Sequence, residues 1–306
     1  MKGAIDAGAT FWNAGIFYGQ GENGELTNLT LIARFFTKYP DLADKVFLSV
    51  KGGLNEHWAP DASPEHLRKD VDRALQALDG KKKLDMFECA RVAPDTYLSP
   101  LKYANWCRPI EEQMKTLAEL VKEGKFDHIG LSECSANTIR RAFKVHPVAT
   151  VEIEYSLWAT EAATNGVLDT AKELGIAIIA YSPLGRGFLT GQWKKPEDVP
   201  PQLRERYPRF APENFEHNLQ FVQVVEEIAK KKGCTPAQIA IKWVEMAGDH
   251  VIPIPGATKF SRVEENMGAA NVEFTKEELE ELNGYAEKAD VKGERYGGEQ
   301  TKLLWG

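Results

Sequence analysis

The stretch VFLSVKGGLNEHWAPDASPEHLRKDVDRALQALDG, residues 46–80, contains one strand, one loop and one helix in succession. Val46–Val50 is a short apolar run of the kind that forms a buried strand. Ser63 followed by Pro64 is typical of a helix start, because serine caps the free N–H groups and proline fits the first helical position. Apolar residues then recur at helical spacing until Gly80, a typical stop. This stretch therefore predicts a buried strand followed by an amphipathic helix.

The same pattern recurs along the chain. We expect strands at seven apolar runs, namely Thr10–Ala14, Val46–Val50, Leu84–Ala90, His128–Ser132, Val148–Glu154, Ile176–Ser182 and Val251–Pro255. Strands that are nearly continuous in apolar residues and alternate with helices indicate a parallel sheet covered by helices. About eight such strand–helix units in roughly 250–330 residues are typical of a (β/α)8 TIM barrel. We therefore predict one barrel domain over residues 1–306, with a long loop at Trp193–Pro212.

A doubly wound open sheet is the alternative. Such a sheet usually carries the dinucleotide-binding motif GxGxxG after its first strand. The stretch GQGENG at Gly19–Gly24 comes nearest to that motif, but a lone match has little specificity. We interpret it as a loop, which favours the barrel.

Composition excludes several classes of function. The net charge of −7 over 306 residues argues against a nucleic-acid-binding surface. No apolar stretch approaches the roughly 20 residues of a membrane span. The four cysteines have no CxxC spacing and the six histidines no i,i+4 pair, so we expect free thiols in a reducing cytoplasm and no metal site.

Polar residues at the ends of the predicted strands are the candidates for chemistry, because barrel active sites lie at the carboxyl ends of the strands. The candidates with this placement are Asn13, Tyr18, Lys51, Arg91, Ser132, Glu133, Glu152, Glu154, Tyr181, Ser182 and the loop 256–266. Each alone is more simply explained as a structural cap. Their convergence on one rim favours an active site.

These strand ends resemble the aldo-keto reductase family. The similar peptides are, in order, FWNAGIFYG at Phe11–Gly19, VFLSVKGG at Val46–Gly53, IGLSE at Ile129–Glu133, EIEYSL at Glu152–Leu157, AYSPLGRGFLTG at Ala180–Gly191 and PIPGATKFSRVEEN at Pro253–Asn266. Six motifs in the family's order make the resemblance specific. Within the family, WNAGIFYG and LDMFECARV (84–92) look most like fungal pyridoxal reductases. The resemblance implies reversible reduction of pyridoxal to pyridoxine with NADPH.

The resemblance also concerns the start of the chain. In the family, a strand and most of a helix precede the peptide that matches Lys2–Gly8. We therefore expect seven of the eight barrel strands in the chain as written, which leaves sheet edges unpaired. On this reading the chain is less stable than a longer relative, prone to aggregate or oligomerise, and weak in NADPH binding.

The catalytic roles follow from the family by position. Tyr18 would donate a proton to the carbonyl oxygen, and Lys51 would lower the pKa of that phenol, which is otherwise about 10. The family's aspartate partner of the lysine is Asn13 here, so we expect Lys51 to act as an uncompensated cation or to lose its proton more readily. The family's substrate-orienting histidine falls at Ala90. Arg91 beside it would bind an oxyanion or form a structural salt bridge.

The cofactor roles are implied in the same way. Ser132, Glu133 and Glu152 occupy the family's carboxamide-binding positions, and Tyr181 would stack on the nicotinamide. The residues that would wrap the pyrophosphate are Ser182, Leu184, Gly185 and Gly187, with the glycines allowing close approach. Lys259 and Arg262 suit the 2′-phosphate of NADP, and Asn266 matches the adenine-contacting position.

Three functions stay open at this point. The leading interpretation is an NADPH-dependent pyridoxal reductase acting on a small-molecule aldehyde. A general reductase of aryl or aliphatic aldehydes is close to it, because the sequence does not define the substrate pocket. The third is a low-turnover NADPH-binding regulatory protein, which the altered positions Asn13 and Ala90 favour and the retained Tyr18 and Lys51 oppose. The sequence gives no indication of the oligomeric state.

Overall fold

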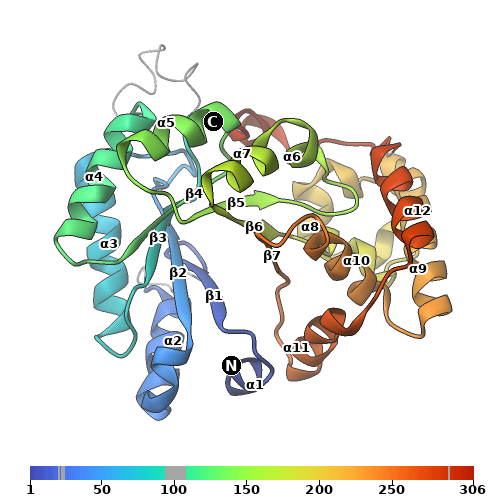
Figure 1. Ribbon diagram of the computed structural model, residues 1–306, viewed down its shortest axis with the longest axis horizontal. Helices are drawn as coiled ribbons and strands as arrows, with labels where there is room; N and C mark the ends of the chain where they lie inside the picture. The colour runs from blue at the N-terminus through green and yellow to red at the C-terminus, as the bar shows by residue number, and fades with distance from the viewer. Residues whose placement is uncertain (20, 22–24, 94–107, 289) are drawn as a thin grey trace. The chain divides into compact units, whose positions relative to one another are not determined.

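The computed structural model describes residues 1–306 except 20, 22–24, 94–107 and 289 (Figure 1). Among these residues the chain forms two compact units. The first consists of Met1–Glu152, Thr170–Ile176 and Leu303–Gly306, and the second of Ile153–Asp169 and Ala177–Lys302. The prediction of one domain over residues 1–306 stays a prediction. Strand β5 (Thr150–Glu154) continues from the first unit into the second.

The first unit contains four further strands and the helices between them. Its strands are β1 (Phe11–Gly15), β2 (Phe47–Gly52), β3 (Met86–Cys89) and β4 (His128–Ser132). Its helices are α1 (Lys2–Asp6), α2 (Thr27–Lys38), η1 (Pro40–Lys45), α3 (Pro64–Leu78), α4 (Ile110–Lys122) and α5 (Ala136–Val145). Helices α2, α3 and α4 follow one another along the sheet (Figure 1). The core between sheet and helices is apolar, with Leu48, Val50, Leu67 and Phe87 excluded from solvent.

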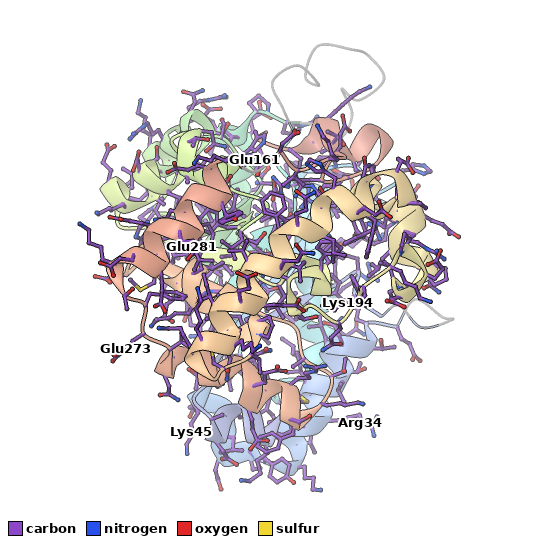
Figure 2. The ribbon with its side chains drawn as sticks, turned by 90° about the vertical axis from the view of Figure 1, so that its right-hand side faces the viewer. Arg34, Lys45, Glu161, Lys194, Glu273 and Glu281 are labelled. Carbon is purple, nitrogen blue, oxygen red and sulfur yellow. The ribbon has the colours of Figure 1, made fainter. Side chains whose placement is uncertain are left out.

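The second unit holds strands β6 (Ala177–Tyr181) and β7 (Val251–Ile254). Its helices are α6 (Glu161–Thr164), the start of α7 (Val167–Leu174), η3 (Gly185–Thr190), η4 (Pro196–Asp198), α8 (Pro201–Arg206), η5 (Pro208–Phe210), α9 (Pro212–Lys232), α10 (Pro236–Glu245), α11 (Phe260–Met267), η6 (Gly268–Asn271), α12 (Lys276–Glu287) and η7 (Gly298–Leu303). The predicted loop Trp193–Pro212 therefore contains three short helices. Charged side chains such as Lys194, Glu273 and Glu281 lie on the outer surface (Figure 2).

Every registered strand pair is parallel, and the order within the sheet is the chain order from β1 to β7. A doubly wound sheet reverses its strand order part-way, so this order is that of a (β/α)8 barrel. The predicted fold class is confirmed, and each of the seven predicted runs overlaps one of the described strands, although β1 and β2 extend one and two residues past the predicted ends.

The stretch that predicts the fold differs in one detail from its expected capping. Pro64 does begin α3, but the Ser63 hydroxyl donates to Asp61 Oδ1 (2.7 Å) and makes no cap hydrogen bond to the helix. The helix ends at Leu78, because Asp79 turns into the left-handed region (φ 49°) before Gly80 (φ 64°). The helix start and stop are therefore where the sequence predicts them, within two residues.

Candidate active site

Lys51 lies at the centre of a buried polar cluster in the first unit. This side chain of β2 is 4% exposed, and its Nζ lies 3.2 Å from Glu152 Oε2 and 3.8 Å from Glu88 Oε1. Nζ also donates to Asn13 Oδ1. Burial lowers the pKa of Lys51, but the carboxylates of Glu152 and Glu88 outweigh burial and raise the pKa above its ordinary value. Lys51 therefore stays protonated at neutral pH.

The strand register brings this cluster together. Lys51 of β2 stands opposite Glu88 of β3, and Glu88 stands opposite Gly130 of β4. Neighbouring strands lie about 4.8 Å apart, so paired side chains on one face are in reach of each other. Parallel pairing thus places an ammonium and a carboxyl group side by side in the interior of the first unit.

Asn13 joins the cluster from β1. Its Nδ2 donates to Glu152 Oε2 (2.7 Å) while its Oδ1 accepts from Lys51. The expectation that Lys51 is uncompensated, or loses its proton more readily, is wrong. The negative charge that Asn13 lacks comes from Glu152 and Glu88, which lie on two other strands.

Tyr18 lies in the loop after β1, with its ring beside the ammonium. Lys51 Nζ is 5.0 Å from the ring centroid. Gly15 leaves the necessary space, because a Cβ there would lie 3.2 Å from Tyr18 Cδ2. The side chain of Asn28, at the start of α2, donates to the carbonyl oxygens of Gly15 (2.8 Å) and Tyr18 (2.6 Å). The loop that carries the phenol is therefore tied down at both ends.

The pKa of Tyr18 differs from the sequence expectation. Partial shielding of the phenol from water raises this pKa, the Lys51 ammonium lowers it, and Glu152 raises it again, so that the pKa is raised overall. The Lys51 ammonium lowers the pKa of Tyr18 as expected, but in the protein without ligand the partial shielding and Glu152 outweigh it. The phenol is protonated at neutral pH, which is the state a proton donor requires.

Arg91 follows β3 by two residues and is half-buried. Its Nη1 donates to the carbonyl oxygen of Ala90 (2.5 Å), so the guanidinium turns back onto its own chain. Ala90 is buried. The structure therefore places Arg91 at the strand end that the sequence indicates.

Ser132 and Glu133 lie at the end of β4, and both are fully buried. The Ser132 Oγ has no hydrogen-bond partner among the described residues. Glu133 takes a left-handed φ of 51°, and its backbone N–H donates to Glu152 O (3.0 Å). Since a buried hydroxyl without a partner costs free energy, Ser132 is suited to bind a polar group of a ligand.

Glycine in the loop after β6 has a structural reason that the sequence does not indicate. Ser182, Gly185 and Gly187 all have positive φ (53°, 55° and 104°), and Leu184 immediately precedes η3. A Cβ at Gly185 would lie 2.5 Å from Trp158 Nε1, and one at Gly187 would lie 3.2 Å from the Trp193 ring. Gly185 and Gly187 therefore leave room for the indole rings of Trp158 and Trp193, respectively. Both glycines also adopt the positive φ angles that the turn requires.

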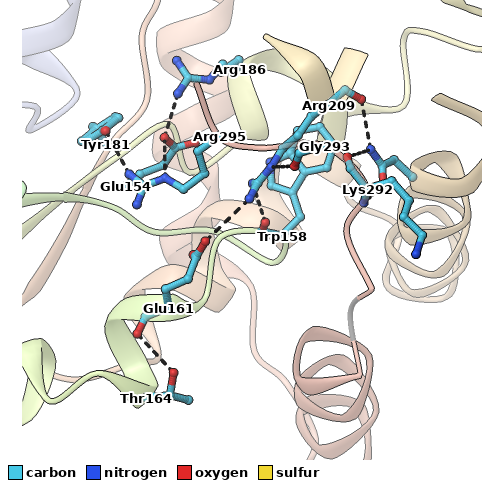
Figure 3. A network of polar contacts seen from close by, with 11 residues as sticks. Glu154, Trp158, Glu161, Thr164, Tyr181, Arg186, Arg209, Lys292, Gly293 and Arg295 are labelled. Carbon is cyan, nitrogen blue, oxygen red and sulfur yellow. Dashed lines mark hydrogen bonds and ion pairs between the residues drawn. The ribbon is translucent and has the colours of Figure 1, made fainter. Parts of the chain in front are cut away.

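Tyr181 ends β6 and belongs to a network of polar contacts in the second unit (Figure 3). Its hydroxyl lies 2.9 Å from the Tyr296 hydroxyl and accepts from Arg295 Nη2 (3.2 Å). Glu154, 2% exposed, accepts from Arg186 Nη2 (2.7 Å) and from Arg295 Nε (3.3 Å). The hydroxyl of Tyr181 is thus held by the side chains of Arg295 and Tyr296, which follow it in the chain by 114 and 115 residues.

The three residues expected to hold the adenosine end of NADP lie on or beside α11. Lys259 precedes the helix and is exposed. Arg262 is half-exposed and pairs with Glu265 (Nη1–Oε2 2.5 Å). Asn266 is buried on the same helix. The two cations therefore lie at a helix N-terminus, an arrangement that suits an anion.

Comparison of the chain with known proteins identifies its family. The model of the aldo/keto reductase family matches residues 1–287. The chain belongs to the aldo/keto reductase family. It is 42% identical to "Probable pyridoxal reductase 2" of Schizosaccharomyces pombe, over 97% of this chain and 87% of that protein. It is 37% identical to "Aldo-keto reductase yakc [NADP(+)]" of the same organism, over 96% of this chain and 83% of that protein.

Solved structures share the fold of this aldo/keto reductase at lower identity. A glycerol dehydrogenase from Gluconobacter oxydans superimposes with a TM-score of 0.79 at 24% identity, over 95% of this chain and 85% of that one. A thermostable aldo-keto reductase in complex with epalrestat gives a TM-score of 0.68 at 21% identity, over 93% and 85% of the two chains. These likenesses support the barrel fold.

Sequence analysis of this aldo/keto reductase missed Glu88, Asn28 and Arg295. Glu88 is a charged residue inside an apolar strand, and this is a signal that could have identified it. Asn28 is one of several polar residues at a helix start and carries no special signal. Arg295 lies beyond the family match, where no motif points to it.

Proposed function

We propose that the chain is an NADPH-dependent reductase of aldehydes and that pyridoxal is its substrate. Membership of the aldo/keto reductase family makes it an oxidoreductase. The observation that carries the proposal is the buried Lys51 ammonium 5.0 Å from the ring centroid of Tyr18, a phenol that is 44% exposed. A protonated phenol next to a fixed cation is the minimum equipment for reducing a carbonyl group.

The described residues fit NADP(H). The unpartnered Ser132 Oγ, in the first unit, offers a hydrogen bond to the carboxamide. In the second unit, Tyr181 would stack on the nicotinamide, and we propose that the loop of Ser182, Leu184, Gly185 and Gly187, with positive φ at three of these residues, wraps the pyrophosphate. The N–H groups of Gly185 and Gly187 donate within the loop to Ser182 O (2.8 Å) and Leu184 O (3.0 Å). Lys259 and Arg262 would hold the 2′-phosphate, and Asn266 the adenine. The relative named with NADP(+) supports this cofactor.

The side chains of the cluster would then perform the following steps. NADPH, when bound, supplies a hydride to the carbonyl carbon. The C=O π bond breaks as Tyr18 transfers its hydroxyl proton to the carbonyl oxygen, and an alcohol forms. The resulting phenolate lies beside Lys51, whose positive charge stabilises it until water returns the proton. We propose that Asn13 orients Lys51 and that Arg91 binds the substrate's phenolate oxygen.

Pyridoxal as substrate rests on the 42% identical relative with that name. Reduction of other aryl or aliphatic aldehydes is the nearest alternative. A low-turnover NADPH-binding protein is a second candidate, which the raised pKa of Tyr18 favours because it makes proton donation harder. In the part of the chain that the structure describes, no helix is both long and apolar enough to span a membrane. We propose a cytoplasmic location, in agreement with the free thiols of Cys89, Cys134 and Cys234.

The test is to compare kcat/KM for pyridoxal and for 4-nitrobenzaldehyde with NADPH, while chromatography identifies pyridoxine as product. We expect pyridoxal to be preferred. A large preference for 4-nitrobenzaldehyde would contradict the vitamin B6 assignment but not the reductase. Binding of NADPH, seen by its fluorescence, without turnover of either aldehyde would favour the low-turnover candidate.

A further inference from the structure

Glu88 is a fully buried acid in the middle of β3. Neither of its carboxyl oxygens accepts a well-formed hydrogen bond from a donor among the described residues, and its carboxyl neighbour is Glu152. Its one described ion pair is with Lys51, at 3.8 Å. The neighbouring strand leaves room for it, because a Cβ at Gly130 would lie 2.7 Å from Glu88 Cβ and 3.0 Å from Glu88 Oε2. Two strands are thus shaped to keep a carboxyl group in the interior.

Charge balance decides the state of this carboxyl group. Glu152 already lies 3.2 Å from Lys51 and is 5% exposed, so the one ammonium is paired with it. A second ionised carboxylate in the same buried cluster would be an uncompensated charge, which is costly. Two carboxyl groups that share a buried site therefore tend to keep one proton between them. Burial and the neighbouring Glu152 accordingly raise the pKa of Glu88 well above its usual range.

We propose that Glu88 and Glu152 form a carboxyl–carboxylate pair that holds one proton and thereby keeps the Lys51 ammonium charged and directed at Tyr18. The pair replaces the carboxylate that Asn13 cannot provide. Glu88 acts through Lys51 and is a positioning residue. This inference rests on the proposed function, in which Tyr18 is the proton donor.

The pair makes reduction sensitive to alkaline pH. While the pair keeps its proton, its single negative charge balances the positive charge of Lys51. Loss of that proton adds a negative charge, which opposes formation of the Tyr18 phenolate and slows reduction. The groups facing the pair are Tyr18 and Asn13 from β1 and its loop and Lys51 from β2. Cys89 is next to Glu88 in β3, but its side chain lies on the other face of the sheet, near Gly53. The pKa values of Tyr18, Lys51 and Cys89 are all raised above their ordinary values, so each of these groups keeps its proton at neutral pH.

The kinetic test uses the isosteric variant Glu88→Gln. This variant lacks the shared proton whose loss slows reduction, so the alkaline fall in kcat is expected to move upward by about one pH unit or more, with KM nearly constant. The matched control is Asp85→Asn. This substitution removes a carboxylate that accepts hydrogen bonds from the N–H of Leu48, near the start of β2, and from Lys82. Its pH profile should keep the wild-type shape. A Glu88→Gln profile that superimposes on the wild type would overturn the proposal.

A rescue experiment separates charge from packing. The side chain at position 13 contacts both Lys51 and Glu152, so Asn13→Asp would place a new carboxyl group against Glu152. In the Glu88→Gln background this second substitution is expected to bring the alkaline fall back toward its wild-type pH. If the double variant keeps the pH profile of Glu88→Gln, the carboxyl pair does not cause the alkaline fall in kcat.

An infrared measurement tests the pair without any turnover. A protonated carboxylic acid gives a C=O stretching band apart from those of carboxylates and amides. We expect such a band at neutral pH in the wild type and in Asp85→Asn, and its loss in Glu88→Gln. A protein with the band but no aldehyde reduction would contradict the proposed function and keep the pair. An active reductase whose infrared spectrum is unchanged by Glu88→Gln would contradict the proposed carboxyl pair but not the proposed function.

Discussion

Gly130 stands opposite Glu88 in the parallel ladder of β3 and β4, and a Cβ at position 130 would lie 2.7 Å from the Cβ of Glu88. Gly130→Ala should therefore destabilise the fold by about 1–3 kcal/mol, the usual cost of overpacking a buried site. Urea unfolding measures this loss. Gly284→Ala on α12 is the control, since no atom lies within 4 Å of the added Cβ. A methyl group there should stabilise the helix by about 0.5–1 kcal/mol. Equal effects at both sites would contradict the close contact.

Tyr18→Phe removes one hydroxyl and leaves the ring in place. We expect kcat to fall at least about a hundredfold, because general acid catalysis contributes that much or more. NADPH affinity, measured by fluorescence, should barely change. A variant with near-wild-type turnover would show that another group donates the proton.

Arg262→Ala should weaken NADPH binding by roughly 2–3 kcal/mol and leave NADH binding nearly unchanged, since a charge-assisted contact to the 2′-phosphate is lost. Titration calorimetry with both cofactors measures the difference. Lys276→Ala on α12 is the control, because its ion pair with Glu280 is exposed. Equal losses for NADPH and NADH would indicate that Arg262 acts only through its contact with Glu265.

Glu154→Gln should lower the free energy of unfolding by about 3–5 kcal/mol. The substitution leaves the buried Arg295 and the largely buried Arg186 without their carboxylate, and breaking a buried pair is costly. Denaturant unfolding measures the loss. The exposed Glu280→Gln should stay within about 0.5 kcal/mol of the wild type. A similarly small change for Glu154→Gln would mean that the network in Figure 3 contributes little.

His66 gives stability a defined pH dependence. Its hydrogen bond to Asp70 raises the pKa of His66 above the usual 6.5, and burial opposes this. Because the folded-state pKa is the higher one, the stabilisation is complete below about pH 6.5 and is lost as pH rises through the folded pKa. His66→Gln should therefore cost more stability at pH 5.5 than at pH 8.5 in urea unfolding. The exposed His57→Gln is the control, and a His66→Gln loss that is the same at both pH values would contradict the assignment.

The sequence predicts the fold well because the relevant signals are local. A strand is visible as an apolar run, and the start and stop of α3 are visible in Ser63, Pro64 and Gly80. Lys51 and Tyr18 are likewise visible, since each lies in a motif at or just after the end of a predicted strand. The family resemblance supplies their roles, which no periodicity could have given.

The rest of the site depends on register and on distant contacts. That Glu88 faces Lys51 follows only once β2 and β3 are paired in the observed register. The same holds for Glu152, 101 residues from Lys51, whose carboxylate corrects the expected charge imbalance. The partners of Tyr181 lie even farther along the chain, and the packing of Trp158 against Gly185 has no sequence signature.

The backbone around Glu133 has a consequence for the order in which the protein matures. Gly306 N–H donates to Glu133 O (3.1 Å), and Gly306 O accepts from Ser135 N–H (3.0 Å). A ribosome synthesises from the N-terminus at about 5–20 residues per second, so residues 133–135 are made roughly 9–34 seconds before residue 306. Until then, water must serve these two backbone groups next to Ser132. Nascent chains arrested before residue 303 should therefore exchange the amide hydrogen of Ser135 faster than the released protein does.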